Sequence, residues 1–333
     1  MGIRHLNKFL RNECRGENIK LIKVAELSGK KIAIDISIYL YKFVGDGLLI
    51  ENLYLMLAIF RYFNIIPIFI FDGKAPTEKK ELLQQRADSK NAAREEFHAL
   101  KQQLVSITDN DDKQEITNAM DLLKKQFVTI SKSQIQLVKL LIRSYGATYF
   151  DAPGEADELC ASLVIKNKVW ACLSEDMDMF VYGCPRVLRY FSLMNQTVVL
   201  YNTEGILDNL DISQKELREI CVLSGTDYNC NLENKNEPNL FKTLTFFKKY
   251  KKDMKKDKGS KDFYEWLNEN TDYIHDIELL KNIYDLFDLN SSNQLHENIQ
   301  VFDSIKIANG PIIKSDLYSI LEKDGFIINR YNL

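Results

Sequence analysis

The chain has few histidines and no closely paired cysteines. Its four histidines lie far apart, and none of its six cysteines belongs to a Cys-x-x-Cys pair. The spacing of 12 residues between Cys160, Cys172 and Cys184 suits no zinc module. We therefore expect no zinc site, and we expect the cysteines to be reduced thiols, mostly buried.

Long apolar runs are also missing. No stretch reaches about 18 apolar residues without a charge or a turn, so no membrane-spanning helix is expected. The opening MGIRHLNKFL lacks the apolar core of a signal peptide, and Leu6 occupies the position where a myristoylation site needs Ser or Thr. These absences predict an intracellular protein of the nucleus or cytoplasm, or of a viral replication site if the source is viral.

An excess of positive charge is absent as well. The chain has 44 basic and 47 acidic residues, which gives a net charge of −3. If the partner is a nucleic acid, it must therefore meet a local positive field rather than a polycation. The length of 333 residues is enough for one large α/β domain or two smaller ones.

What the sequence does contain is a set of seven carboxylates at the ends of hydrophobic strands or at turns. They lie in the stretches IAIDIS, FIFDGK, PGEADE, LSEDMD and SGTDY. Acids in such positions line the carboxyl edge of an open α/β sheet, where ligands bind. So many acids in one cleft repel one another unless divalent cations lie among them, and Mg²⁺ is the usual choice for phosphates. The seven are Asp35, Asp72, Glu155, Asp157, Asp176, Asp178 and Asp227.

Each acid also has an ordinary structural explanation. Asp72 could be a turn residue, Glu155 a helix-start acid and Asp176 an N-cap. Their joint occurrence at successive strand ends and turns favours a shared site. Two Mg²⁺ ions roughly 4 Å apart can hold a phosphodiester for in-line attack by water.

The expected elements predict an α/β fold with a mostly parallel central sheet flanked by helices. Strand, long helix and strand follow one another over residues 30–73, an order that favours parallel pairing. Residues 77–127 then form a long polar helical segment with a thin apolar stripe, so they bridge solvent or cover a ligand. Further strands are expected at 147–150 and 168–176, with a hairpin or meander from 186 to 201 and helices over 203–223.

Taken together, the motifs resemble the flap endonuclease family of structure-specific 5′ nucleases, which includes the XPG-type repair nucleases. The resemblance covers about residues 1–230, and the motifs occur in family order. They are Met-Gly-Ile at 1–3, Ile-Asp-Ile-Ser at 34–37, Phe-Asp-Gly-Lys-Ala-Pro at 71–76, Pro-Gly-Glu-Ala-Asp at 153–157, Ser-Glu-Asp-Met-Asp at 174–178 and Gly-Thr-Asp-Tyr at 225–228.

The resemblance implies a PIN-like nuclease core whose seven carboxylates bind two Mg²⁺ ions, or Mn²⁺ in their place. Asp176 and Asp178 then also count as catalytic. Lys79 and Arg86 match the two family cations that contact the scissile phosphate from the base of a helical arch.

The same resemblance implies a set of DNA contacts. Tyr41 would stack on a base near the cut, although a core tyrosine is almost as good an explanation. Gly2 would let the chain end approach the DNA, and the arch would pass a 5′ single strand. The basic residues available for that passage are Lys74, Lys79, Lys80, Arg86, Lys90, Arg94 and Lys101.

After Asp227 the chain departs from the family. The stretch 229–238 lacks the two glycines of the turn that grips duplex phosphates through K⁺, so a K⁺ site is doubtful. Lysines follow it, among them Lys242, Lys248 and Lys249, and predict duplex binding, with a solvated helix as the alternative. The end GFIINRYNL shows no sliding-clamp motif, so clamp recruitment is not supported.

These observations divide the chain into a nuclease core at 1–226, with an arch at 77–130, and a helical duplex-binding region with a C-terminal extension at 227–333. We expect a monomer that hydrolyses DNA at a 5′ flap, end or junction, as a flap endonuclease or 5′–3′ exonuclease in replication, repair or recombination. An RNA endonuclease or a four-way-junction resolvase remains open. A silent nucleic-acid-binding scaffold is disfavoured, because all seven acids are present.

Overall fold

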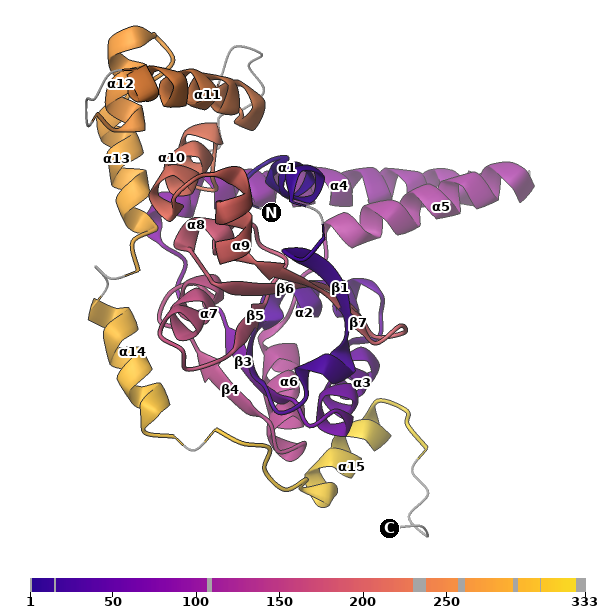
Figure 1. Cartoon of the computed structure of the whole chain (residues 1–333). Coiled ribbons are helices and arrows are strands. Elements are labelled where there is room, and N and C mark those ends of the chain that lie inside the picture. The colour runs from indigo at the N-terminus through magenta and orange to yellow at the C-terminus, as the bar shows by residue number, and fades with distance from the viewer. Residues whose placement is uncertain are drawn as a thin grey trace.

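The computed structural model describes residues 2–14, 16–106, 110–229, 238–256, 261–289, 293–305 and 307–327. Within them, one seven-stranded sheet has the order β1-β7-β6-β5-β2-β3-β4 (Figure 1). Neighbouring strands from β4 to β6 run parallel, and β7 is antiparallel to both β6 and β1. The expected mostly parallel α/β fold is therefore confirmed. The strands are β1 (Ile19–Lys23), β2 (Lys31–Asp35), β3 (Ile66–Phe71), β4 (Thr148–Asp151), β5 (Ala171–Leu173), β6 (Arg186–Ser192) and β7 (Thr197–Asn202).

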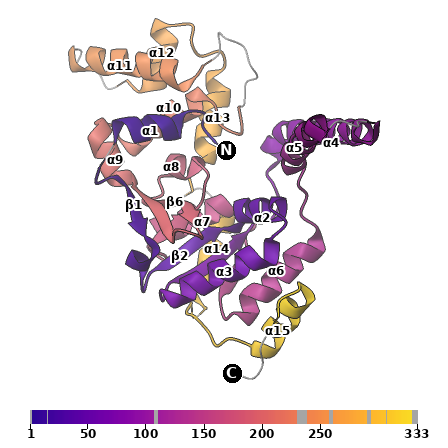
Figure 2. The same cartoon turned by 90° about the vertical axis from the view of Figure 1, so that its right-hand side faces the viewer.

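Helices cover both faces of the sheet, because its central strands are apolar on both sides. In β2, Ile32 and Ile34 pack into one core cluster and Ala33 into the other. The first cluster includes α2 (Ile36–Gly45), α3 (Leu49–Tyr62), α6 (Lys132–Ser144) and α15 (Lys314–Lys323), which lie together in Figure 2. The second includes α1 (Leu6–Glu13), α7 (Ala156–Ile165), α8 (Asp178–Tyr182), α9 (Thr203–Leu210) and α10 (Gln214–Ser224).

The polar segment forms two helices, as its composition predicts. A short 3₁₀ turn (Thr77–Lys79) leads into α4 (Lys80–Ser106), and α5 (Asn110–Gln126) returns beside it. The pair projects away from the sheet and its flanking helices (Figures 1 and 2). The rings of Phe97 and Phe127, 5.4 Å apart, lie in the thin apolar seam of this projection.

The C-terminal helices fall into two groups. Helices α11 (Leu240–Lys256), α12 (Phe263–Asn270) and α13 (Ile277–Leu286) lie beyond α10, at the top of Figure 1. Helices α14 (Asn293–Asp303) and α15 return along the sheet, where Phe302 of α14 lies 5.4 Å from Phe150 of β4. The proposed division at residues 226 and 227 stays a prediction.

Two details of the fold differ from a reading of the sequence. Strand β1 was not anticipated; it is short and pairs with β7 at the sheet edge. Strand β5 covers only Ala171–Leu173, so the segment 174–177 is free to turn toward α8. No described helix is long and apolar enough to cross a membrane.

Candidate active site

The predicted acids gather at the carboxyl edge of the parallel strands. Asp35 ends β2, and Asp72 directly follows β3. The segment after β5 carries Asp176 and Asp178, and Glu155 precedes α7 in the connection from β4. Because β5, β2, β3 and β4 are parallel neighbours, their carboxyl ends share one edge of the sheet.

Hydrogen bonds tie the acids of neighbouring strands together. The hydroxyl of Ser174 donates to Oδ2 of Asp35 at 2.9 Å, and the hydroxyl of Ser37 donates to Asp72. The amide of Ala156 donates to Oδ1 of Asp72 at 2.9 Å. Serines next to the acids therefore fix carboxylate orientations across β5, β2, β3 and the start of α7. The sequence motifs contain both serines, but their role in orienting the acids was not predicted.

Burial and mutual repulsion act on these carboxylates together. Burial and the neighbouring Asp72 raise the pKa of Asp35 to about 7. The pKa of Asp157 is raised by burial and by Glu155, and that of Asp178 by burial and by Asp176. The folded chain therefore shifts Asp35, Asp157 and Asp178 toward their protonated forms, and a bound divalent ion would favour their ionised forms.

Asp178 gives the clearest sign of an expected cation. Its side chain is fully buried, and neither carboxylate oxygen has a hydrogen-bond partner among the described residues. A buried carboxylate without partners is costly, and hard oxygen donors suit Mg²⁺. The oxygen donors of the seven acids suit that ion, and their role in holding it stays a prediction. In the described part of the chain, no three His, Cys, Asp or Glu side chains already surround a single point.

Gly2 lies against the same acids. A Cβ atom on Gly2 would come within 2.5 Å of an oxygen of Asp178 and 2.6 Å of an oxygen of Asp176. Its φ of +69° is also one that side chains disfavour. A side chain at this position would therefore crowd Asp176 and Asp178. The predicted approach of Gly2 to DNA stays a prediction.

Two cations from the base of the projecting helices reach into the acids. Lys79 is 5% exposed, and its Nζ lies 2.6 Å from Oε2 of Glu155 and 4.0 Å from Oδ2 of Asp227. Nη2 of Arg86 lies 2.8 Å from the same oxygen of Asp227. Burial is the largest single influence on the pKa of Lys79 and would lower it, but Glu155, Tyr228 and Asp157 together outweigh burial and raise the pKa. The spacing of seven residues thus brings both cations to the acids; their phosphate contacts stay a prediction.

One aromatic residue, Tyr228, also contacts this cluster. The ring of Tyr228 lies 4.7 Å from Nζ of Lys79, and its hydroxyl donates to Glu155 over 3.4 Å. Tyr228 was part of the Gly-Thr-Asp-Tyr motif, but no role was predicted for it. Its position directly after an acid of that motif is the sequence signal that could have indicated a role at the site.

Tyr41 is not a core residue, since it is 45% exposed. Its ring lies 5.0 Å from Nζ of Lys90 on α4, so it faces the space beside the projecting helices. The alternative of a core tyrosine is therefore wrong, and the stacking role remains a prediction.

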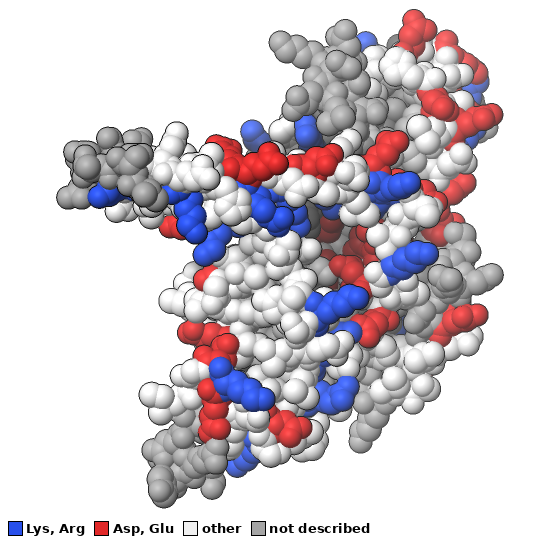
Figure 3. Space-filling model, turned by 180° about the vertical axis from the view of Figure 1, so that it is seen from behind, with Lys and Arg blue, Asp and Glu red and all other residues white. Residues whose placement is uncertain are grey.

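Charges on α4 are separated by sign. Figure 3 shows Lys and Arg along the side of the projection that faces the body of the molecule and Asp and Glu along the other side. The spacing of four and seven residues places Lys90, Arg94 and Lys101 on one helix face. The same helix therefore presents a basic side to any strand passing beneath it.

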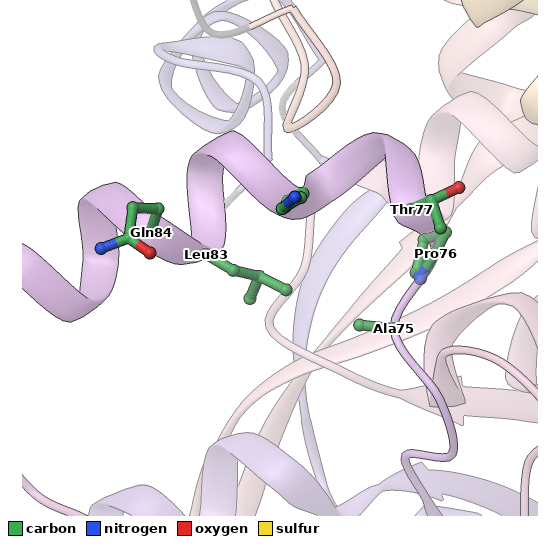
Figure 4. Close-up of a pocket in the computed structure, with 6 residues that line it drawn as sticks. Ala75, Pro76, Thr77, Leu83 and Gln84 are labelled. Carbon is green, nitrogen blue, oxygen red and sulfur yellow. The ribbon is translucent and has the colours of Figure 1, made fainter.

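An apolar pocket of about 360 Å³ lies at the base of α4 (Figure 4). None of the seven acids lines it, so it is distinct from the acid cluster. Its lining residues are Ala75, Pro76, Thr77, Lys80, Leu83 and Gln84.

The remaining predicted DNA contacts lie farther apart. Lys74 is exposed in the turn after β3. On α11, Lys248 and Lys249 are exposed and Lys242 is half-buried. The K⁺ question depends on residues 230–237, which lie outside the described residues, as do the last residues from 328.

Comparison with known proteins agrees with this geometry. Residues 1–93 match the family description "XPG N-terminal domain", and residues 146–227 match "XPG I-region". Flap endonuclease 1 of Trypanosoma brucei gambiense is 32% identical over 250 residues, which are 68% of this chain and 61% of that protein. The chain thus matches less than two thirds of that relative's length.

Two solved structures share the fold. The catalytic core of Rad2 in complex with a DNA substrate gives a TM-score of 0.65 at 20% identity, covering 97% of this chain and 95% of that one. The Holliday junction-resolving enzyme GEN1 in complex with product DNA and a Mg²⁺ ion gives 0.56 at 17% identity, covering 91% and 70%. On its two matching regions and its relatives, this chain belongs to the XPG family, which includes the flap endonucleases.

Proposed function

We propose that the protein is a Mg²⁺-dependent, structure-specific 5′ nuclease that hydrolyses DNA phosphodiesters near a flap, an end or a junction. The observation that carries this proposal is the reach of Lys79 and Arg86 into the acids at the sheet edge. The fold thus places acids that need cations beside two basic side chains that suit phosphate, at the same edge of the sheet. The name of the trypanosome relative supports the flap as the first substrate to test.

Each group has a role in this proposal. When bound, Mg²⁺ would supply an activated water and neutralise the leaving oxygen. The seven acids would hold the metal. Lys79 and Arg86 exchange their carboxylate partners for phosphate oxygens, to which a point charge and a planar fork are both suited. Tyr41, exposed beside α4, offers a ring face to an unpaired base.

A double-flap DNA labelled at its 5′ end tests the proposal. We expect cleavage near the flap base in Mg²⁺ and none in EDTA, with 5′-phosphate and 3′-hydroxyl ends. Nicked duplex, four-way junction and RNA versions are compared at equal salt, because phosphate contacts weaken with salt. Preferential cutting of junctions or RNA would replace the flap substrate, and no cutting of any substrate in Mg²⁺ or Mn²⁺ would favour a silent scaffold.

A further inference from the structure

Arg189 lies directly behind the segment 174–178, which carries Asp176 and Asp178. It belongs to β6 and is 5% exposed. Its Nη2 donates to the carbonyl of Glu175 at 2.8 Å, and its Nη1 donates to the sulfur of Met177 at 2.6 Å. The residues that Arg189 contacts thus alternate with the two acids.

The side chain of Glu175 strengthens this attachment. Its Oε2 lies 3.5 Å from Nε of Arg189, and its Oε1 accepts a hydrogen bond from the amide of Tyr190 at 2.5 Å. The Nε contact is a charge interaction, since that nitrogen makes no hydrogen bond within the described residues. Both the backbone and the side chain of Glu175 are therefore held to β6.

The same guanidinium reaches the first helix of the chain. Nη1 of Arg189 also donates to Oδ1 of Asn7 at 3.0 Å, and the hydroxyl of Tyr201 donates to that oxygen at 2.8 Å. The amide of Asn7 donates to the hydroxyl of Tyr190 at 2.7 Å. Asn7 is on α1, a few residues after Gly2, which lies against the acids.

We propose that Arg189 is a positioning residue that fixes the acid segment 174–178 and the chain start relative to one another. It acts through Glu175, Met177 and Asn7, and it is too deeply buried to contact DNA. This inference rests on the proposed function, because it assigns Arg189 the task of holding Asp176 and Asp178 where they can bind metal. Outer residues that orient metal ligands typically change metal affinity or activity by 10- to 100-fold when mutated.

The planar fork of arginine matters here as much as its charge. A lysine has the same charge, but its three donors share one nitrogen on a flexible stem. It cannot reproduce the planar fork, in which Nη2 holds the carbonyl while Nη1 holds the sulfur and the amide oxygen. Arg186 provides a matched control on the same strand. Its Nε donates to the carbonyl of Trp170 at 2.6 Å, and within the described residues its side chain makes no hydrogen bond to the acid segment.

The test compares Arg189→Lys with Arg186→Lys in the full chain. Mn²⁺ affinity is measured by calorimetry without DNA, together with the Mg²⁺ concentration that half-saturates cleavage. For Arg189→Lys we expect Mn²⁺ affinity to fall about tenfold and the Mg²⁺ requirement to rise in step. Excess Mg²⁺ should restore most of kcat, and flap binding in EDTA should be unchanged. Arg186→Lys should behave as the wild type.

Unchanged Mn²⁺ affinity in a folded Arg189→Lys variant, or equal losses in both variants, would overturn the proposal. If Arg189→Lys does not fold, the Glu175→Gln variant tests the proposal instead, because it removes only the side-chain charge contact between Glu175 and Arg189. A folded Glu175→Gln variant should bind Mn²⁺ more weakly, and wild-type affinity there would also overturn the proposal. Failure of the proposed function looks different, because the wild-type protein itself would bind no Mn²⁺ or cut no substrate.

Discussion

The acid edge of the sheet and the lysine-rich helix α11 are both dense in charge, but they hold it differently. Asp35, Asp157 and Asp178 are at most 8% exposed and are anchored at strand or helix ends. Lys248 and Lys249 are exposed on a helix surface. Buried charge needs partners supplied by the fold or by a ligand, whereas exposed charge is hydrated and screened by salt.

This difference predicts a ranking of effects. A single change at the acid edge removes an interaction that water cannot replace, so its effect should be large and nearly independent of salt. A single change on α11 removes one of several exposed cations, so its effect should be small and dependent on salt.

Asp178→Asn should have the largest effect. The substitution keeps the size of the side chain but removes a negative charge whose oxygens have no hydrogen-bond partner among the described residues. We expect cleavage to fall about 10³-fold, as for the loss of one strong transition-state contact, while flap binding in EDTA persists. Removal of the repulsion from Asp176 should also raise the melting temperature of the metal-free protein.

The control for that change is Asp208→Asn, which alters an exposed acid on α9. It should leave cleavage and melting temperature unchanged. Wild-type cleavage by the Asp178→Asn protein would remove Asp178 from the metal site.

Lys79→Met should come next. Lys79 is a buried cation paired with Glu155, so its loss should lower kcat about 10²-fold through the missing phosphate contact. The affinity for metal should instead rise, because Glu155 would no longer be neutralised by a lysine. Calorimetry with Mn²⁺ measures this, with the exposed neighbour changed in Lys80→Met as the control. Weaker Mn²⁺ binding by Lys79→Met would show that the ion pair supports the metal site rather than competing with it.

Glu219 of α10 is an intermediate case, a 3% exposed acid with one lysine partner, Lys215, at 3.6 Å. Burial raises its pKa to about 7 from an ordinary value of 4.5. Between these values the folded state keeps a proton that the unfolded state has released, so stability falls as pH rises from about 4.5 to 7 and is level above.

Urea unfolding at pH 5 and pH 8 measures this loss. Glu219→Gln should reduce the drop in the free energy of unfolding by roughly 1–3 kcal/mol, because glutamine does not ionise. Glu204→Gln, at an exposed position of α9, should leave the drop unchanged. An equal drop in wild type and Glu219→Gln would show that Glu219 is already ionised at pH 5.

Much of the fold could be predicted because strand burial and motif position coincide. The runs that precede Asp35 and Asp72 are apolar throughout, as strands covered on both faces must be. Strand β1 was not foreseen, because a five-residue edge strand has only one neighbour and this one carries two lysines. Its pairing depends on β7, far along the chain, and no local signal reports it.

The site was predicted less evenly. Acid positions follow from strand ends, so the placement of Asp35, Asp72 and Asp178 could be read from sequence. The partners that orient them could not, because Ser174 meets Asp35 across 139 residues and Arg189 meets Asn7 across 182. Such contacts depend on tertiary packing, which one sequence does not specify by spacing.

Lys248→Gln with Lys249→Gln should have the smallest effect and tests the exposed side of the ranking. If each lysine meets one phosphate, the slope of log Kd against log salt should lose about 0.9 per substitution. Flap binding is measured in EDTA across a salt series, with Lys20→Gln on the exposed edge strand as the control. An unchanged slope would mean that α11 is a solvated helix, whereas a loss that persists at high salt would place these lysines in a buried contact. If these lysines are exposed, hydrated charges, the loss of flap binding should become smaller as salt rises. Substitutions of the buried acids at the sheet edge should show no such dependence on salt.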